Sequence, residues 1–166
     1  MAGGLKLVSG IVDDAKSGLC VDESRIFATG FSAGGEMVYS IACAMAKVFR
    51  AVAAQSGNNA YACPGGTDPI AFYGQHGIGD TVLPIADGRN MRDRFVKNNG
   101  CTPVTASAMS PKKGSGTHVK TEYKGCKEGY PVTWIEFDGP HTPQPKDKGA
   151  TNTFAADETW AFFSQF

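Results

Sequence analysis

Ser32 stands in the pentapeptide Gly-Phe-Ser-Ala-Gly at 30–34, after a short apolar run and before a segment with helical spacing. A tight strand-to-helix turn needs small neighbours and exposes the side chain at its corner, as in the G-x-S-x-G nucleophile elbow. A serine placed there can attack a carbonyl carbon when a base removes its proton. The same residues fit a glycine-rich turn whose serine caps the following helix. The pentapeptide by itself leaves both interpretations open.

The base for such a serine must come from three histidines, His76, His118 and His141. His141 follows an expected strand at 130–139 and agrees with the chain order nucleophile, acid, histidine. His118 lies in the polar excursion between Cys101 and Cys126, far from any expected strand end, and we expect it to be solvated. His76 ends an expected strand at 68–77, and as a base it would break that order. We therefore expect His76 to pack at the strand end and to orient the loop that follows.

The acid that holds the imidazole is expected to be Asp80, which follows the strand at 68–77 by a short loop. Asp138 is the rival acid, but it stands three residues before His141 on the same loop. Asp80 could instead cap a turn, since Gly-Asp-Thr is good turn chemistry. The order Ser32, Asp80, His141 puts each residue just beyond its own strand, at one edge of a sheet.

The elements that must position these residues alternate along the chain. Short apolar runs predict strands, and apolar residues at helical spacing predict helices. The expected strands are 21–30, 49–57, 68–77 and 130–139, and the expected helices are 5–19, 35–47, 88–99 and 155–166. Such alternation predicts an α/β fold with a mostly parallel sheet, helices on both faces, and ligands at the carboxyl ends of the strands. Only the stretch 111–117, rich in Lys, Gly and Ser, is expected to be mobile.

The composition limits the classes of partner. The 166 residues fit a single domain. The formal net charge is zero, so the sequence lacks the positive charge expected of a protein that binds nucleic acid or another polyanion. No apolar run has the length of a membrane span, and the first ten residues lack the pattern of a secretory signal. A neutral or small molecule is the expected partner, with no nucleic acid and no membrane.

The five cysteines show no C-x-x-C spacing, so neither a zinc site nor any other metal is expected. Cys101 and Cys126 bracket a polar excursion with little apolar content, which a disulfide would stabilise by roughly 3 kcal/mol. Disulfides indicate an oxidising compartment, whereas the alternative is five buried free thiols in a cytosolic protein.

Four stretches together resemble the secreted feruloyl esterase and acetylxylan esterase group, which includes extracellular polyhydroxybutyrate depolymerases. They are LCVDESRIFATGFSAGGEM at 19–37, HGIGDTVLP at 76–84, DGPHTP at 138–143 and ETWAFFSQF at 158–166. The resemblance implies an α/β-hydrolase fold, secretion, no cofactor, and a triad of Ser32, Asp80 and His141. It also implies disulfides Cys20–Cys43 and Cys101–Cys126, which would leave Cys63 as the odd cysteine.

Two departures from that group stand out. Thr142-Pro143-Gln144 occupies the place where comparable members carry a tryptophan after the histidine. The group's chains also begin further upstream, with the first strands of the sheet and a His-Gly loop that donates to the oxyanion hole. The sequence therefore resembles the carboxyl-terminal portion of such a hydrolase, lacking the amino-terminal strands, with the Ala33 N–H as the expected oxyanion donor. Self-association, or pairing with the missing amino-terminal segment, is expected to cover the sheet edge.

The resemblance implies a carboxylic ester hydrolase that releases ferulate or related cinnamoyl groups from arabinoxylan through an acyl-enzyme. Gln55, Asn58 and Tyr61 follow strand ends and are the expected substrate-binding residues. The alternatives are an acetylxylan esterase or polyester depolymerase, a serine peptidase of the prolyl-oligopeptidase kind, and an inactive remnant that keeps the triad.

Overall fold

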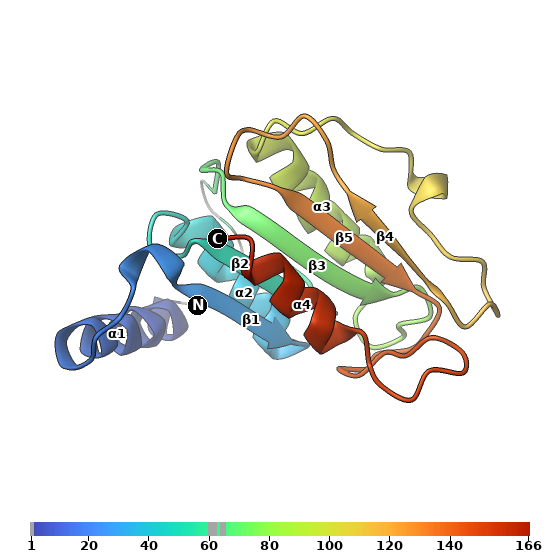
Figure 1. The fold of residues 1–166 in the computed structure, drawn as a ribbon, viewed down its shortest axis with the longest axis horizontal. Coiled ribbons are helices and arrows are strands. Elements are labelled where there is room, and N and C mark those ends of the chain that lie inside the picture. Colours follow the sequence, from blue (N-terminus) through green and yellow to red (C-terminus); the bar gives the residue numbers. More distant parts are fainter. Residues whose placement is uncertain (1, 60–62, 64–65) are drawn as a thin grey trace.

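The computed structural model describes residues 2–59, 63 and 66–166, in which helices are interspersed with strands (Figure 1). The helices are α1 (Ala2–Gly18), α2 (Ala33–Ala44), α3 (Ile85–Asn98) and α4 (Ala155–Phe163), with short 3₁₀ turns at Glu23–Arg25 and Ala106–Ala108. The strands are β1 (Phe27–Phe31), β2 (Ala51–Gln55), β3 (Ala71–Gly77), β4 (His118–Glu122) and β5 (Val132–Phe137). They follow one another in the order α1-β1-α2-β2-β3-α3-β4-β5-α4. The strand expected at 21–30 begins only at Phe27, because Glu23–Arg25 form a 3₁₀ turn, and the other expected strands and helices are present with ends shifted by a few residues.

The strands form one sheet in the order β1-β2-β3-β5-β4. Four of them are parallel: β1 pairs with β2, β2 with β3, and β3 with β5. Their carboxyl ends therefore meet at one edge of the sheet, as the alternation of elements predicted. In the described part of the chain, β1 forms one lateral border of this sheet and β4 the other.

Strand β4 corrects the interpretation of the polar excursion. It pairs antiparallel with β5, from His118 opposite Phe137 to Glu122 opposite Thr133. The expectation that His118 is solvated and far from a strand end is wrong. His118 begins β4, its Nδ1 lies 2.9 Å from Asp147 Oδ1, and its ring centroid lies 4.1 Å from that of Phe154. The strand was missed because an edge strand is held by backbone pairing and needs little apolar content.

Helices cover both faces of the sheet, as predicted. α2 and α3 pack on one face, where the core includes Tyr39, Phe72 and Phe95. α4 crosses the other face, where Tyr73 and Phe162 are buried (Figure 1). Successive side chains of a strand point to opposite faces, so the neighbours Phe72 and Tyr73 in the fully buried β3 contribute to the two separate cores.

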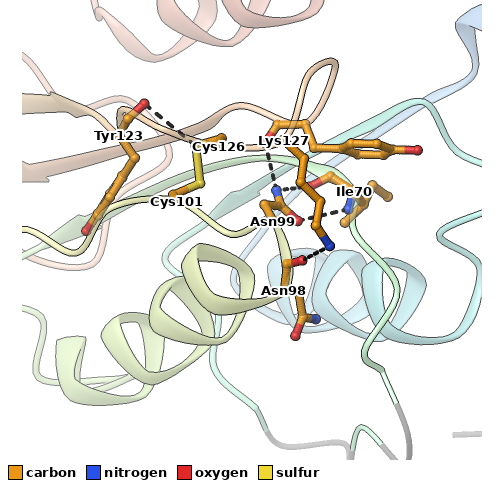
Figure 2. The surroundings of a disulfide bond; sticks show 8 residues. Ile70, Asn98, Asn99, Cys101, Tyr123, Cys126 and Lys127 are labelled. Atoms are coloured by element: carbon orange, nitrogen blue, oxygen red, sulfur yellow. Dashed lines mark hydrogen bonds between the residues drawn. A yellow bond between two sulfur atoms is a disulfide. The ribbon is translucent and has the colours of Figure 1, made fainter.

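The disulfide Cys101–Cys126 is formed, as predicted, and ties the end of α3 to the turn before β5 (Figure 2). Beside it the wholly buried Asn99 side chain accepts from the Ile70 N–H at 3.2 Å and donates to the Ile70 carbonyl at 2.7 Å. The same amide donates to the Tyr130 carbonyl at 3.0 Å. This cluster fastens the segments that enter β3 and β5 to the end of α3.

The expected disulfide between Cys20 and Cys43 is wrong. Cys43 pairs with Cys63, at a Cα–Cα distance of 5.6 Å, and Cys20 is an exposed free thiol. Cys20 follows α1, whereas Cys43 occupies the last turn of α2. Arg94 of α3 donates to the Cys63 carbonyl at 3.1 Å and so helps to hold Cys63 in place. Spatial proximity, rather than the spacing along the chain, decides the pair.

Peptide mapping under non-reducing conditions should therefore recover Cys43 linked to Cys63 and Cys101 linked to Cys126. Cys20 should be the cysteine that an alkylating reagent modifies without reductant. Closing loops of about these lengths should stabilise the chain by roughly 3 kcal/mol each, so reduction should lower its resistance to urea. A peptide that joins Cys20 to Cys43 would contradict this pairing.

An ion pair between the half-buried Arg89 and the buried Glu136 lies between α3 and β5. Glu136, whose side chain is wholly buried, accepts from Arg89 Nε at 2.9 Å and from Arg89 Nη2 at 2.6 Å. Trp134 Nε1 donates to Glu136 at 2.9 Å, and the Ser110 hydroxyl also donates to it. Burial would raise the pKa of the Glu136 carboxyl, but these hydrogen bonds outweigh burial and lower it below its usual range.

Glu136→Gln is expected to lower the free energy of unfolding by about 3 kcal/mol near pH 7, because Arg89 loses its buried counter-charge. A carboxyl whose pKa is lower in the folded than in the unfolded protein stabilises the fold at pH values above its unfolded pKa of about 4.3. This stabilisation is lost as the pH falls through the folded-state pKa. Urea unfolding at several pH values should show the difference between the two proteins shrinking in acid. Glu128→Gln, at an exposed position, is the matched control and should change little. A difference that stays constant in acid would contradict this account.

Candidate active site

Ser32 occupies the corner between β1 and α2 in a strained backbone conformation. Its φ is 56° and its ψ is −119°, a region that residues other than glycine rarely adopt. Its N–H donates to the Gln55 carbonyl of β2 at 3.0 Å, which fixes the corner to the sheet. A Cβ on Gly30 would lie 2.5 Å from the Gly34 carbonyl group, so the turn requires a glycine at 30.

The serine does not act as a helix cap. Among the described residues its side chain makes no capping hydrogen bond to α2, and its Oγ instead lies 2.9 Å from His141 Nε2. Strain at a single exposed hydroxyl is characteristic of functional sites. The geometry of a nucleophile elbow is therefore present, and of the two interpretations of the pentapeptide the turn with a serine cap is excluded.

The structure brings Ser32, His141 and Asp80 into one hydrogen-bonded chain. His141 Nδ1 lies 2.7 Å from Asp80 Oδ2, on the opposite side of the ring from the serine. Asp80 follows β3 and His141 follows β5, so both residues lie at the carboxyl edge of the sheet beside the elbow. The imidazole also packs against Phe31, with ring centroids 4.6 Å apart. This arrangement can move a proton from the hydroxyl to the imidazole and stabilise the resulting cation.

Asp80 is held in its charged form. The Val82 and Leu83 N–H groups each donate to its Oδ1 at 2.9 Å. Burial by itself would raise the pKa of the Asp80 carboxyl, but the hydrogen bonds from His141 and from these two backbone groups lower it. The carboxylate is thus ionised at neutral pH, as an acid that orients a histidine must be.

The rival residues have other partners. Asp138 Oδ2 accepts from the Gly116 N–H at 2.7 Å and so supports the turn before β4. His118 is paired with Asp147. His76 is wholly buried, and its Nε2 lies 2.8 Å from the Leu83 carbonyl, in the loop that carries the acid. His76 therefore packs at the strand end as the sequence indicated.

Two of the three expected substrate-binding residues, Gln55 and Asn58, lie in the described part of the chain. Gln55 donates through Nε2 to Thr159 Oγ1 of α4 at 3.3 Å, so its side chain braces the helix. Asn58 borders a cavity of about 220 Å³ beyond the carboxyl end of β2. Tyr61 lies outside the described residues, and Ala33 is the first residue of α2, where backbone N–H groups have no partner within the helix.

Three further residues border this cavity and were not among those expected from the sequence: Asn59, Asp87 and Asn90. The only signal was the position of Asp87 and Asn90 just after the Asp80 loop, at the start of α3. A second cavity, of about 550 Å³, lies at the opposite edge, where residues that precede β2, β3 and β5 border it. In the part of the chain that the structure describes, no group of His, Cys, Asp or Glu side chains could hold a metal ion, and no helix could cross a membrane.

The fold is that of the α/β-hydrolases: a mostly parallel sheet with helices on both faces and a serine elbow at its carboxyl edge. The acetyl xylan esterase from Aspergillus awamori shares it, with a TM-score of 0.65 and 17% sequence identity over 96% of this chain and 66% of that one. An identity this low shows the fold alone.

Comparisons of sequence confirm the resemblance to the feruloyl esterase group. Feruloyl esterase D from Neurospora crassa is 46% identical over 156 residues, which cover 94% of this chain and 53% of that protein. Probable feruloyl esterase C from Aspergillus terreus is 47% identical over 158 residues, which cover 95% of this chain and 56% of that protein. This chain thus spans about half the length of these curated relatives. The prolyl oligopeptidase family also matches, at residues 9–62.

Proposed function

We propose that the protein is a serine esterase, a carboxylic ester hydrolase acting on plant cell-wall polysaccharide. The hydrogen-bonded chain of Ser32, His141 and Asp80 is the observation that carries the proposal. Ser32 attacks the ester carbonyl while His141 takes its proton, and His141 then protonates the leaving alcohol. Water repeats the cycle on the acyl-enzyme. The Ala33 N–H donates to the oxyanion of the tetrahedral intermediate.

The proposed substrates are feruloyl or related cinnamoyl esters on arabinoxylan. The names of the two fungal relatives, at 46% and 47% identity, support this acyl group. Acetylxylan is the second candidate, supported by the name of the acetyl xylan esterase that shares the fold. A polyester is the third. The proposed reaction needs no cofactor.

A serine peptidase is the alternative activity, favoured by the prolyl oligopeptidase match at residues 9–62. That match includes the elbow but neither Asp80 nor His141, and both enzyme classes have an elbow of this kind. It therefore does not discriminate between ester and amide cleavage.

Turnover of a substrate panel tests the proposal: methyl ferulate, methyl p-coumarate, p-nitrophenyl acetate and a peptide amide. We expect cinnamoyl methyl esters to give the highest kcat/KM and the amide to give none. Preference for the acetate would favour acetylxylan, and cleavage of the amide would favour the peptidase. No turnover of any substrate would contradict the proposal and indicate an inactive remnant.

We also propose that the protein acts outside the cell. Two disulfides form among the described residues, and disulfides persist in oxidising compartments. Detecting the protein in the culture medium of the producing organism would test this proposal, and its retention in the cytosol would contradict it.

The chain of 166 residues is expected to self-associate. In the described structure β1 forms a lateral border of the sheet, and Leu7 and Ile11 of α1 are 65% and 59% exposed. An open sheet edge beside exposed apolar residues favours pairing with another chain. Light scattering should show a mass that rises with concentration, and Thr29→Lys on β1 should reduce the rise more than Thr29→Ser. A monomer at all concentrations would contradict this expectation.

A further inference from the structure

His76 of β3 lies directly beneath the acid of the triad. Its Nε2 is 2.8 Å from the Leu83 carbonyl oxygen and 3.2 Å from Asp80 Oδ2. Both neighbours are acceptors, since a carbonyl and a carboxylate have no proton to give. Nε2 must therefore carry a proton, which it shares between the two oxygens.

The ring of His76 is fixed in this orientation. Its Nδ1 is buried and has no hydrogen-bond partner in the described part of the chain. α3 approaches it so closely at Gly88 that a Cβ there would lie 2.6 Å from Nδ1. Burial lowers the pKa of His76 despite the opposing hydrogen bonds and the Asp80 charge, so the ring is neutral at neutral pH. His76 is thus a rigid donor with one tautomer.

The carboxylate of Asp80 has a separate set of donors at each oxygen. Val82 and Leu83 hold Oδ1 through their N–H groups. Oδ2 receives His141 Nδ1 at 2.7 Å and His76 Nε2 at 3.2 Å. The two donors on Oδ1 fix that atom but do not set the direction of Oδ2, which the contacts from His141 and from the rigid His76 ring restrict. The hydrogen bond from His76 to the Leu83 carbonyl also closes the loop that supplies those donors.

We propose that His76 is a positioning residue, which directs Asp80 Oδ2 at His141 by donating its Nε2 proton to both Asp80 and the Leu83 carbonyl. The inference rests on the proposed function and extends it. His76 has no part in the proposed proton transfer, and the proposal gives it the role of orienting Asp80.

The test compares His76→Gln with His76→Asn, because both introduce an amide but only the glutamine amide reaches the position of Nε2. The asparagine amide stops near Nδ1 and cannot donate to Asp80 or to Leu83. We expect His76→Asn to lower kcat on methyl ferulate roughly tenfold to 100-fold with little change in KM, as when an outer partner of an active-site histidine is lost. His76→Gln should stay within a few-fold of the parent protein.

Proton NMR gives a readout that needs no turnover. The His141 Nδ1–H bonded to Asp80 should give a far-downfield resonance, assigned by its loss in Asp80→Asn. This resonance should weaken or move in His76→Asn and return in His76→Gln. Equal behaviour of the two variants, or an unchanged resonance in His76→Asn, would overturn the proposal.

Nitrogen NMR of the unsubstituted protein covers the case in which a variant fails to fold. The ¹⁵N shifts of His76 should report a neutral ring protonated at Nε2, and protonation at Nδ1 alone would overturn the proposal. Failure of the proposed function has a different signature. It would appear as a parent protein that turns over no ester, whereas both NMR measurements would still decide the role of His76.

Discussion

Ser32→Ala is expected to reduce kcat on methyl ferulate by about 10⁶-fold, close to the loss from removing the whole triad. The reason is that the residues act as one unit: without Oγ, the proton acceptor His141 Nε2, 2.9 Å away, has nothing to activate. KM should change little. The measurement is steady-state turnover of the parent protein and the variant, with circular dichroism to show that the fold is intact.

The matched comparison is His141→Ala, together with the double variant. Losses within a unit are not additive, so the double variant should be no slower than either single variant. Multiplied losses would mean that the two residues act independently. Turnover of Ser32→Ala at the level of the parent protein would show that another group is the nucleophile.

Asp80→Asn is expected to lower kcat by about 10⁴-fold, because the amide favours the wrong tautomer of His141. The carboxylate accepts His141 Nδ1–H at 2.7 Å, whereas an amide that keeps the two backbone donors of Val82 and Leu83 on its oxygen presents an N–H to that position. His141 Nδ1 would then have to accept, so the ring's own proton would sit on Nε2, which could no longer take the proton of Ser32. Single-turnover kinetics on methyl ferulate should place the loss in the chemical step.

Asp138→Asn is the control for this prediction. Asp138 accepts from the Gly116 N–H at 2.7 Å, and an asparagine oxygen can accept the same bond. We therefore expect kcat to stay within a few-fold of that of the parent protein. Full activity in Asp80→Asn together with a large loss in Asp138→Asn would transfer the role of the acid to Asp138.

Local patterns predicted most of the sheet. Buried strands such as β2 and β3 begin with apolar runs, Ala-Val-Ala-Ala and Ala-Phe-Tyr, so they can be recognised from their own residues. Strand β4 could not be, because its residues alternate between half-buried and exposed positions and it is held by backbone pairing with β5. A strand whose stability comes from its neighbour has a weak signal in its own sequence.

Some contacts between distant segments could likewise be predicted from the sequence, and others could not. The disulfide Cys101–Cys126 encloses one polar excursion and could be predicted, whereas Cys43–Cys63 depends on which cysteine the fold brings next to α2. The ion pair of Arg89 with the buried Glu136 has no such local signal. The sequence 130–139 has an acidic residue inside an apolar run, and only the packing of α3 on β5 supplies its partner.

The sequence by itself determined the elbow, the chain order of Ser32, Asp80 and His141, and the parallel arrangement that places all three at one edge. These follow from local sterics and from the rule that parallel strands end on the same side. Only the tertiary structure decided that the serine hydroxyl meets His141 rather than caps α2, that Asp138 supports a turn, and that His76 Nε2 lies 3.2 Å from the acid. Those outcomes depend on side-chain directions and distances of about 3 Å between loops far apart in the chain, which no local pattern encodes.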